Sequence, residues 1–429
     1  MARFTFISTD PAPERAILMG IDWREGGWPV ERSLDELERL ASTAGAVVVG
    51  RLTQRLDKPI PKSFIGSGKV AELSGLAQAT DADVVIFDDD LSPSQQAHLE
   101  NAVGEHVKII DRTALILDIF GLHAQTREGR LQVQLAQLQY LLPRLRGMWS
   151  HLAKEQTRGG IGSRFGQGES QLEVDRRMIR NRISVLRHEL RELEKRRSVQ
   201  AKERVGSPVF RVALAGYTNA GKSTLLNRLT GSCVLSQDKL FATLDPTTRA
   251  YALPGGRAMT LTDTVGFIQK LPHGLVEAFK STLSEVRGAD LILKVVDVSD
   301  TDRLRHIEAV ESVLREIGAG EQPAVIVYNK IDLLSPEDAA ALQLREPQAV
   351  LFSAQTGEGL ERLTDRIARE AAARDELVSL CLPYREGRLL AIVREQGQII
   401  SESYEPEGVE LICKVSPRIK KMLARYLVR

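Results

Sequence analysis

The sequence predicts an α/β fold class: an α/β domain and a long antiparallel helical hairpin come first, a second α/β domain follows, and a small α+β domain ends the chain. Three observations predict this order. Short apolar runs alternate with amphipathic stretches in residues 1–125 and again in 206–372, two apolar seams occupy 126–205, and strand and helix patterns mix in 373–429. Alternating strands and helices are typical of open, mostly parallel sheets.

Length and composition set the broad class of protein. The chain has 429 residues, enough for roughly two to four domains, and 43% of them are hydrophobic. The N-terminus lacks a secretory apolar segment, and no apolar run approaches the ~20 residues of a membrane helix. Three cysteines, Cys233, Cys381 and Cys413, lie far apart and in no metal-ligand spacing. We therefore expect free thiols and a cytoplasmic location.

Residues 1–125 have the pattern of an open α/β sheet. We predict strands at 15–21, 46–49, 84–87 and 107–110, and helices that begin near Ser33, Gly66 and Ser92. The letters GSGK at 66–69 form a fragment of a phosphate-binding loop without its full spacing. A turn that caps a helix is the prediction there, and a second nucleotide site is the alternative.

Residues 126–205 predict two long helices packed as an antiparallel hairpin. Apolar residues recur at steps of three and four in two runs, at Leu131, Leu135, Leu138, Leu142 and Leu145, and at Ile179, Ile183, Leu186, Leu190 and Leu193. Between the runs, residues 158–170 contain five glycines. Because glycine disfavours a helix, we predict a flexible loop over 158–170.

The hairpin segment is also strongly basic. Residues 126–205 hold 18 Lys and Arg against 9 Asp and Glu, a net charge of +9, so the rest of the chain carries −8. Five arginines fall within 176–187. This asymmetry favours a surface that binds a polyanion such as RNA. The alternatives are a solvated coiled-coil face with Glu–Arg pairs and a surface that contacts acidic lipid.

The remaining segments continue the pattern. In 206–372 we predict strands at 209–215, 259–263, 291–298, 324–328 and 349–353. In 373–429 we predict a strand at 378–382, a helix at 386–395, two strands joined by a turn at 406–408, and a last helix. These two segments form the second α/β domain and the small α+β domain.

A phosphate-binding loop is predicted at 216–223. The letters GYTNAGKS fit the G-x-x-x-x-G-K-[ST] pattern between an apolar strand and a helix. Backbone N–H groups and a helix N-terminus then face the phosphates, Lys222 reaches the β- and γ-phosphates, and the Ser223 hydroxyl binds Mg²⁺. The candidate residues are Gly216, Tyr217, Thr218, Asn219, Ala220, Gly221, Lys222 and Ser223.

Three further motifs follow strands in the order expected for a GTP site. In the first motif, residues 263–266, Asp263 holds Mg²⁺ and Gly266 donates its N–H to the γ-phosphate. In the second, Asn329 braces the phosphate loop, Lys330 covers the base, and Asp332 accepts from guanine N1–H and N2–H₂, a donor pair that adenine lacks. In the third, the Ala354 N–H meets guanine O6. The residues are Asp263, Thr264, Val265 and Gly266; Asn329, Lys330, Ile331 and Asp332; and Ser353, Ala354 and Gln355.

A switch segment is predicted at 241–249, FATLDPTTR. It needs a threonine that completes Mg²⁺ coordination when the γ-phosphate is present, and Thr243, Thr247 and Thr248 are candidates. Phe267 stands where many small GTPases carry a glutamine that orients the attacking water. We therefore predict slow intrinsic hydrolysis with a catalytic group supplied from elsewhere; simple core packing of Phe267 is the alternative.

Nearly the whole chain resembles the HflX family of ribosome-associated GTPases. The resemblance lies in FATLDPTTR, DTVGFI, FIGSGKVAEL (64–73), the stretch 111–145 and GQGESQLEVDRR (166–177). The family loop is closer to GPGE where this chain has SRFGQGE. The resemblance implies that Thr243 is the switch threonine, so that Ser223, Thr243 and Asp263 hold the metal and Lys222, Thr243 and Gly266 act in catalysis. Its nucleotide contacts include Phe241, Ala242, Thr243, Leu244 and Asp245.

The resemblance also implies partners. Family members bind GTP or GDP and the large ribosomal subunit with its RNA, hydrolyse GTP faster with ribosomes, and help to split stalled ribosomes under heat stress. A monomer with at most peripheral membrane contact is expected. Two alternatives remain: an RNA- or assembly-binding module gated by GTP, and a membrane-associated GTPase switch.

Overall fold

The computed structural model describes residues 13–24, 28–104, 106–156, 165–205, 209–231, 240–241, 245–254, 256–270 and 284–428. They form two compact units, Met1–Ala124 with Arg130–Arg187, and Gln125–Gly129 with His188–Arg429. Within the described ranges, no helix is long and apolar enough to cross a membrane.

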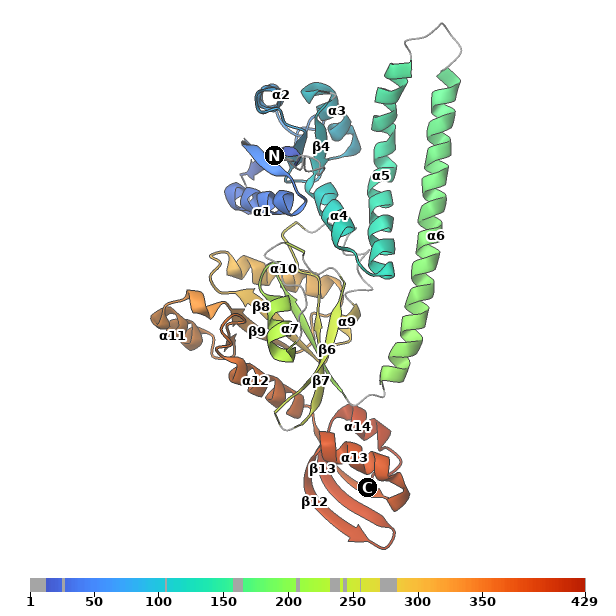
Figure 1. Cartoon of the computed structure of the whole chain (residues 1–429), viewed down its shortest axis with the longest axis vertical. Coiled ribbons are helices and arrows are strands. Elements are labelled where there is room, and N and C mark those ends of the chain that lie inside the picture. The colour runs from blue at the N-terminus through green and yellow to red at the C-terminus, as the bar shows by residue number, and fades with distance from the viewer. Residues whose placement is uncertain are drawn as a thin grey trace, which may run out of the picture. The chain divides into compact units, whose positions relative to one another are not determined.

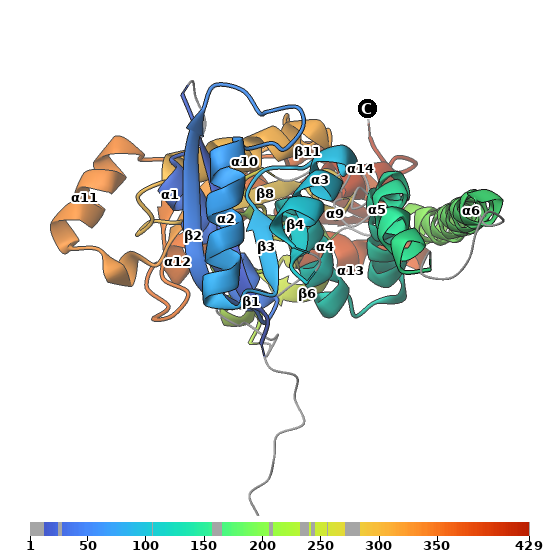
Figure 2. The same cartoon turned by 90° about the horizontal axis from the view of Figure 1, so that it is seen from above.

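The first unit contains a four-stranded parallel sheet in the order β2-β1-β3-β4. Its strands are β1 (Arg15–Trp23), β2 (Val47–Leu56), β3 (Val84–Phe87) and β4 (Lys108–Asp111). Its helices are α1 (Val30–Thr43), α2 (Ser67–Thr80), α3 (Pro93–Val103) and α4 (Arg112–His123). Figure 2 shows α2 over one face of this sheet. The predicted α/β fold of this segment is confirmed. Helix α4 was not predicted, because its apolar residues do not form a stripe along one face of a helix.

Local sequence explains where these helices begin. Ser92 accepts from the N–H of Gln95 while the Gln95 side chain accepts from the N–H of Ser92, which is a capping box. Gly66 is the N-cap of α2, and its N–H donates to the side chain of Gln54 at 3.0 Å. The GSGK letters thus start a helix, as the capping prediction expected.

A buried ion cluster lies at the carboxyl edge of this sheet. Arg112, 1% exposed, pairs with Asp88 and with Glu36, each at 2.7 Å. Buried charges are tolerated only when paired in this way. Next to it, Asp111 accepts from Tyr140 at 2.9 Å and Arg144 at 3.1 Å, which fixes one arm of the hairpin on the sheet.

The hairpin consists of α5 (Arg127–Gln156) and α6 (Phe165–Val205), and its arms lie side by side in Figure 1. Arg182 of α6 donates to Gln134 of α5 at 3.1 Å. Seam residues of both arms are buried, namely Leu135, Leu145, Ile183 and Leu186. The loop prediction was wrong for residues 165–170, which begin α6. A first helical turn tolerates glycine, because its N–H groups need no intrahelical partner.

The second unit contains a six-stranded sheet in the order β10-β9-β8-β5-β7-β6, in which only β6 is antiparallel to its neighbour. Its strands are β5 (Phe210–Gly216), β6 (Thr247–Ala252), β7 (Ala258–Asp263), β8 (Leu291–Asp297), β9 (Ala324–Asn329) and β10 (Val350–Leu351). Its helices are α7 (Lys222–Thr230), α9 (Ser284–Arg287), α10 (Arg303–Glu316), η1 (Ile331–Leu333), α11 (Pro336–Arg345) and α12 (Leu360–Ala372).

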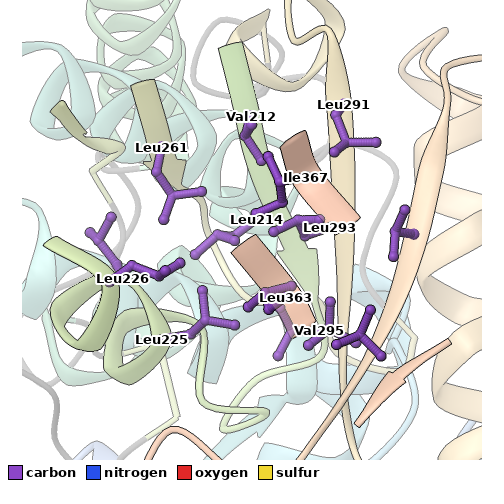
Figure 3. Close-up of a cluster of buried hydrophobic side chains, with 14 of the residues drawn as sticks. Val212, Leu214, Leu225, Leu226, Leu261, Leu291, Leu293, Val295, Leu363 and Ile367 are labelled. Carbon is purple, nitrogen blue, oxygen red and sulfur yellow. The ribbon is translucent and has the colours of Figure 1, made fainter. Parts of the chain in front are cut away.

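The core of this sheet positions the loops at its edge. Figure 3 shows Leu225 and Leu226 of α7 and Leu363 and Ile367 of α12 against the strands. The strand side chains in this cluster are Val212, Leu214, Leu261, Leu291, Leu293 and Val295. Burial of apolar area contributes ~25 cal/mol per Å² and holds both helices on the sheet. The positions of the strand ends, and of the loops that follow them, are therefore fixed.

The C-terminal α+β domain has an antiparallel sheet in the order β11-β13-β12. It comprises β11 (Glu376–Leu382), η2 (Tyr384–Glu386), α13 (Gly387–Gln396), β12 (Gln398–Glu405), β13 (Gly408–Val415) and α14 (Pro417–Met422). Arg418 pairs with Asp290 at 2.7 Å, and Arg257 pairs with Asp375 at 2.6 Å. These buried or half-buried ion pairs fasten the small domain to the six-stranded sheet domain.

Candidate nucleotide-binding site

The predicted motifs meet at one edge of the six-stranded sheet. Strands β5, β8, β9 and β10 are parallel, and so are β5 and β7. Their carboxyl ends carry the loops that start at Gly216, Asp263, Asp297, Asn329 and Phe352. In open α/β sheets, ligands bind outside this edge.

The loop between β5 and α7 has a backbone that only glycine permits at its two ends. A Cβ on Gly216 would lie 2.3 Å from the carbonyl oxygen of Val295. Gly221 has φ +88°, and a Cβ there would lie 2.1 Å from Asn329 Nδ2. The glycines of the pattern thus allow close approach of the loop to two neighbouring strands.

Lys222 is the first residue of α7, and its side chain reaches back to the start of this loop. Its ammonium donates to the carbonyls of Gly216 at 3.1 Å and Tyr217 at 2.8 Å, and the residue is 6% exposed. Burial lowers the pKa of Lys222 to about 8, and the negative charge of Asp263 opposes this shift. A cation held here without full solvation favours an anionic ligand such as a phosphate.

Ser223 and Asp263 form the candidate metal pair. The Ser223 hydroxyl donates to Asp263 Oδ2 at 2.6 Å, and Asp263 is fully buried. The next residue, Thr264, donates to the carbonyl of Leu214 at 2.6 Å and fixes this turn. The described residues contain no group of three His, Cys, Asp or Glu that could hold a metal. Two oxygen donors fit Mg²⁺, which keeps further positions for phosphate and water.

Phe267 is buried, and its backbone is hydrogen-bonded to the phosphate-binding loop. It is 2% exposed, its N–H donates to the carbonyl of Gly216 at 3.1 Å, and its carbonyl accepts from Thr218 at 2.7 Å. Gly266 therefore lies against the phosphate-binding loop, because a Cβ on it would be 3.0 Å from Lys222 Nζ. The core-packing alternative holds for the Phe267 side chain, and no glutamine stands at this position.

Asn329 joins the phosphate-binding loop to the loop after β10. Its Nδ2 donates to the carbonyl of Ala220 at 2.8 Å, and its Oδ1 accepts from the Ala354 N–H at 2.9 Å. The expected brace is therefore present. The Ala354 N–H, predicted to meet guanine O6, is engaged by Asn329 in this structure.

Asp332 and Lys330 are each held by a neighbour. Ser353 donates to Asp332 Oδ1 at 2.5 Å. Lys330 has φ +66° and pairs with Asp297 at 2.6 Å. Sequence reasoning missed Asp297, although its position at the end of a predicted strand was a usable signal.

The other predicted residues have different surroundings. Ala242, Thr243 and Leu244 lie outside the described residues, whereas Phe241, Val265 and Ile331 are buried. Thr247 and Thr248 belong to β6, not to a loop. The Asp245 carboxylate accepts from the N–H groups of residues 125 and 126. Asn219 lies in the loop with φ +60°, and Gln355 is exposed. Tyr217, a predicted residue of the phosphate-binding loop, stacks on His306, which sequence reasoning missed, with ring centroids 3.8 Å apart.

Comparisons with known proteins show which family the chain resembles. Family models match three stretches: GTP-binding GTPase N-terminal (31–121), GTP-binding GTPase Middle Region (123–204) and 50S ribosome-binding GTPase (211–330). GTPase HflX of Caldanaerobacter subterraneus subsp. tengcongensis is 48% identical over 97% of this chain and 94% of that relative. GTPase HflX of Escherichia coli K12 is 44% identical over 92% of each.

A solved structure was also found, a GTP-binding protein from Sulfolobus solfataricus in complex with GDP. It is 24% identical over 83% of this chain and 98% of that chain, with a TM-score of 0.43. The fold and the site define a GTP-binding protein of the P-loop class. The chain belongs to the GTPase HflX family, and it is a GTP hydrolase.

Proposed function

We propose that this GTPase binds GTP with Mg²⁺ at the edge described above and associates with the large ribosomal subunit to split stalled ribosomes. Lys222 binds the β- and γ-phosphates, and Ser223, Asp263 and Thr243 hold the metal. Asp332 accepts from guanine, and the Gly266 N–H binds the γ-phosphate. The metal, when bound, neutralises charge that develops on the phosphates.

One observation carries the nucleotide part of this proposal. Asn329 donates to the phosphate-binding loop at Ala220 and accepts from Ala354, while Ser353 of the same loop holds Asp332. The phosphate and base motifs therefore belong to one network of hydrogen bonds. That arrangement supports a single pocket that selects guanine.

The charge on α6 supports the ribosomal part. Arg177, Arg180, Arg187, Arg191 and Arg196 are exposed. Within the part of the chain that the structure describes, Lys195 with Glu192 is an ion pair of this helix, but none involves these five arginines. Unpaired guanidinium groups bind phosphates well, which favours RNA over the solvated coiled-coil alternative. The matching family model is described as a 50S ribosome-binding GTPase.

In this proposal the chain acts in a fixed order. GTP orders the segments next to Lys222 and Gly266, and that geometry lets the hairpin engage the large subunit. The buried Phe267 leaves the attacking water without an orienting glutamine, so hydrolysis waits for the ribosome. Hydrolysis removes the γ-phosphate contacts, and the protein dissociates.

The test compares single-turnover GTP hydrolysis with and without purified large ribosomal subunits. We expect slow hydrolysis alone and at least about tenfold stimulation by the subunits. Asp332→Asn should lose GTP binding, whereas Asp365→Asn, on an exposed position of α12, should behave as wild type. Fast hydrolysis without subunits would contradict the proposal.

A second assay separates the switch from a binding module. Light scattering follows the splitting of purified 70S ribosomes by wild type and by Lys222→Ala. We expect splitting only with wild type and GTP. Normal splitting by Lys222→Ala would favour an RNA-binding module in which the nucleotide is incidental.

A further inference from the structure

Asp245 makes a contact that the nucleotide site does not require. Its Oδ2 accepts from the N–H of Gln125 at 2.9 Å and of Thr126 at 2.8 Å, and its Oδ1 accepts from the Thr126 hydroxyl. These residues precede α5, whose first residue is Arg127. The contact joins residues 119 and 120 positions apart and lies within the second compact unit.

The contact has the chemistry of a helix cap supplied from another segment. The Thr126 hydroxyl accepts from the Gly129 N–H at 3.0 Å, so Thr126 caps α5. The Asp245 carboxylate takes two more N–H groups at the positive end of the same helix. A carboxylate is favoured there by charge and by hydrogen bonding.

Gly129 leaves the space that this carboxylate fills. A Cβ on Gly129 would lie 2.5 Å from Asp245 Oδ1 and 3.2 Å from Thr126 Oγ1. Gly129 has no positive φ, so its backbone alone does not require glycine. The close approach of the carboxylate accounts for it.

Asp245 is also connected to the candidate metal pair. It lies two residues before β6, and Thr247, the first residue of β6, pairs with Asp263 in the β6–β7 register. Asp263 in turn accepts from Ser223. Hydrogen bonds to Asp245, the short chain from Asp245 to Thr247, and the pairing of Thr247 with Asp263 therefore link the start of α5 to the site where Mg²⁺ and phosphate are proposed to bind.

We propose that Asp245 is a positioning residue that couples the nucleotide-binding site to the first turn of the hairpin arm α5. The proposal deepens the proposed function, on which it rests. A nucleotide state that shifts the segment before β6 changes the cap of α5. By linkage, a partner that holds this end of α5 changes the relative affinity for GTP and GDP by the same factor.

The first test is the ratio of affinities for a non-hydrolysable GTP analogue and for GDP, measured by calorimetry on the full chain. We expect Asp245→Ala to change this ratio by at least about fivefold, the lower end of measured couplings between sites. An unchanged ratio would mean that Asp245 only caps α5, and would overturn the proposal. Failure of the wild type to bind either nucleotide would overturn the proposed function as well.

Gly129→Ala provides a second variant that keeps Asp245. Alanine normally stabilises a helix relative to glycine, but here its methyl must displace the carboxylate. We expect the same change in the ratio as for Asp245→Ala, and no further change in the double variant. Gly75→Ala in α2 is the matched control, because a Cβ there meets nothing within 4 Å. Independent effects of the two changes would contradict a shared contact.

Hydrogen exchange reports the contact directly. The amides of Gln125 and Thr126 should exchange about tenfold faster or more in Asp245→Ala, since each loses a charge-assisted hydrogen bond. In wild type their protection should differ between the GTP-analogue and GDP states. Equal protection in both states would overturn the coupling.

Discussion

Raising the pH should weaken nucleotide binding through Lys222. Burial lowers its pKa from 10.5 to about 8 in the free protein. Bound phosphates favour the charged ammonium, so binding must add a proton wherever the free protein has lost it. The affinity is therefore full well below pH 8 and falls as the pH rises through this value.

The magnitude follows from the fraction of Lys222 that carries a proton. With a pKa of about 8, roughly nine-tenths is charged at pH 7 and roughly one-tenth at pH 9, so GDP should bind about tenfold more weakly at pH 9. A tenfold change corresponds to about 1.4 kcal/mol. The full tenfold effect is reached when contacts with the bound phosphates raise the pKa of Lys222 well above 9.

Calorimetry in buffers of different ionisation enthalpy measures both affinity and proton uptake. We expect uptake of about half a proton at pH 8, approaching one at pH 9. Lys222→Met keeps the unbranched stem and should bind weakly with no proton uptake from this position. An affinity that does not change with pH, with no proton uptake, would show that the two carbonyl contacts keep Lys222 charged. It would refute the conclusion that burial lowers the pKa of this lysine.

Three further substitutions test the structure. Phe267→Gln should leave the single-turnover rate of GTP hydrolysis within about twofold of the wild-type rate, and a faster rate would show that residue 267 acts in the site. The same variant should lower the free energy of unfolding in urea by roughly 2–4 kcal/mol, because the side chain is buried. Arg257→Ala should lower the free energy of unfolding by about 3 kcal/mol, because it leaves the buried charge of Asp375 without its partner. The double variant with Asp375→Ala should regain part of this stability, and additive losses would contradict an interaction between the two residues. Gly216→Ala should abolish GDP binding, since its Cβ would meet the Val295 carbonyl at 2.3 Å; unchanged affinity would disprove this tight approach.

Short-range patterns made most of the fold predictable. The strands at the two sheets and both hairpin helices follow from apolar spacing, which reflects the periods of strand and helix. The phosphate-binding loop was equally visible, because its glycines and Lys222 act within eight consecutive residues. Strand β6 was missed, since TTRAYA has no apolar alternation and becomes a strand only by pairing with β7.

The sequence by itself determined the chemistry of the site. The Lys222 loop and the motif around Asp332 are each a short continuous stretch of sequence, and the local backbone of each follows from its own residues. Tertiary structure decided how these pieces act on one another. It buried Phe267, placed Asn329 between two loops and brought Asp245 to the start of α5. These outcomes depend on contacts between distant residues, whose energies are set by packing and appear in no local pattern.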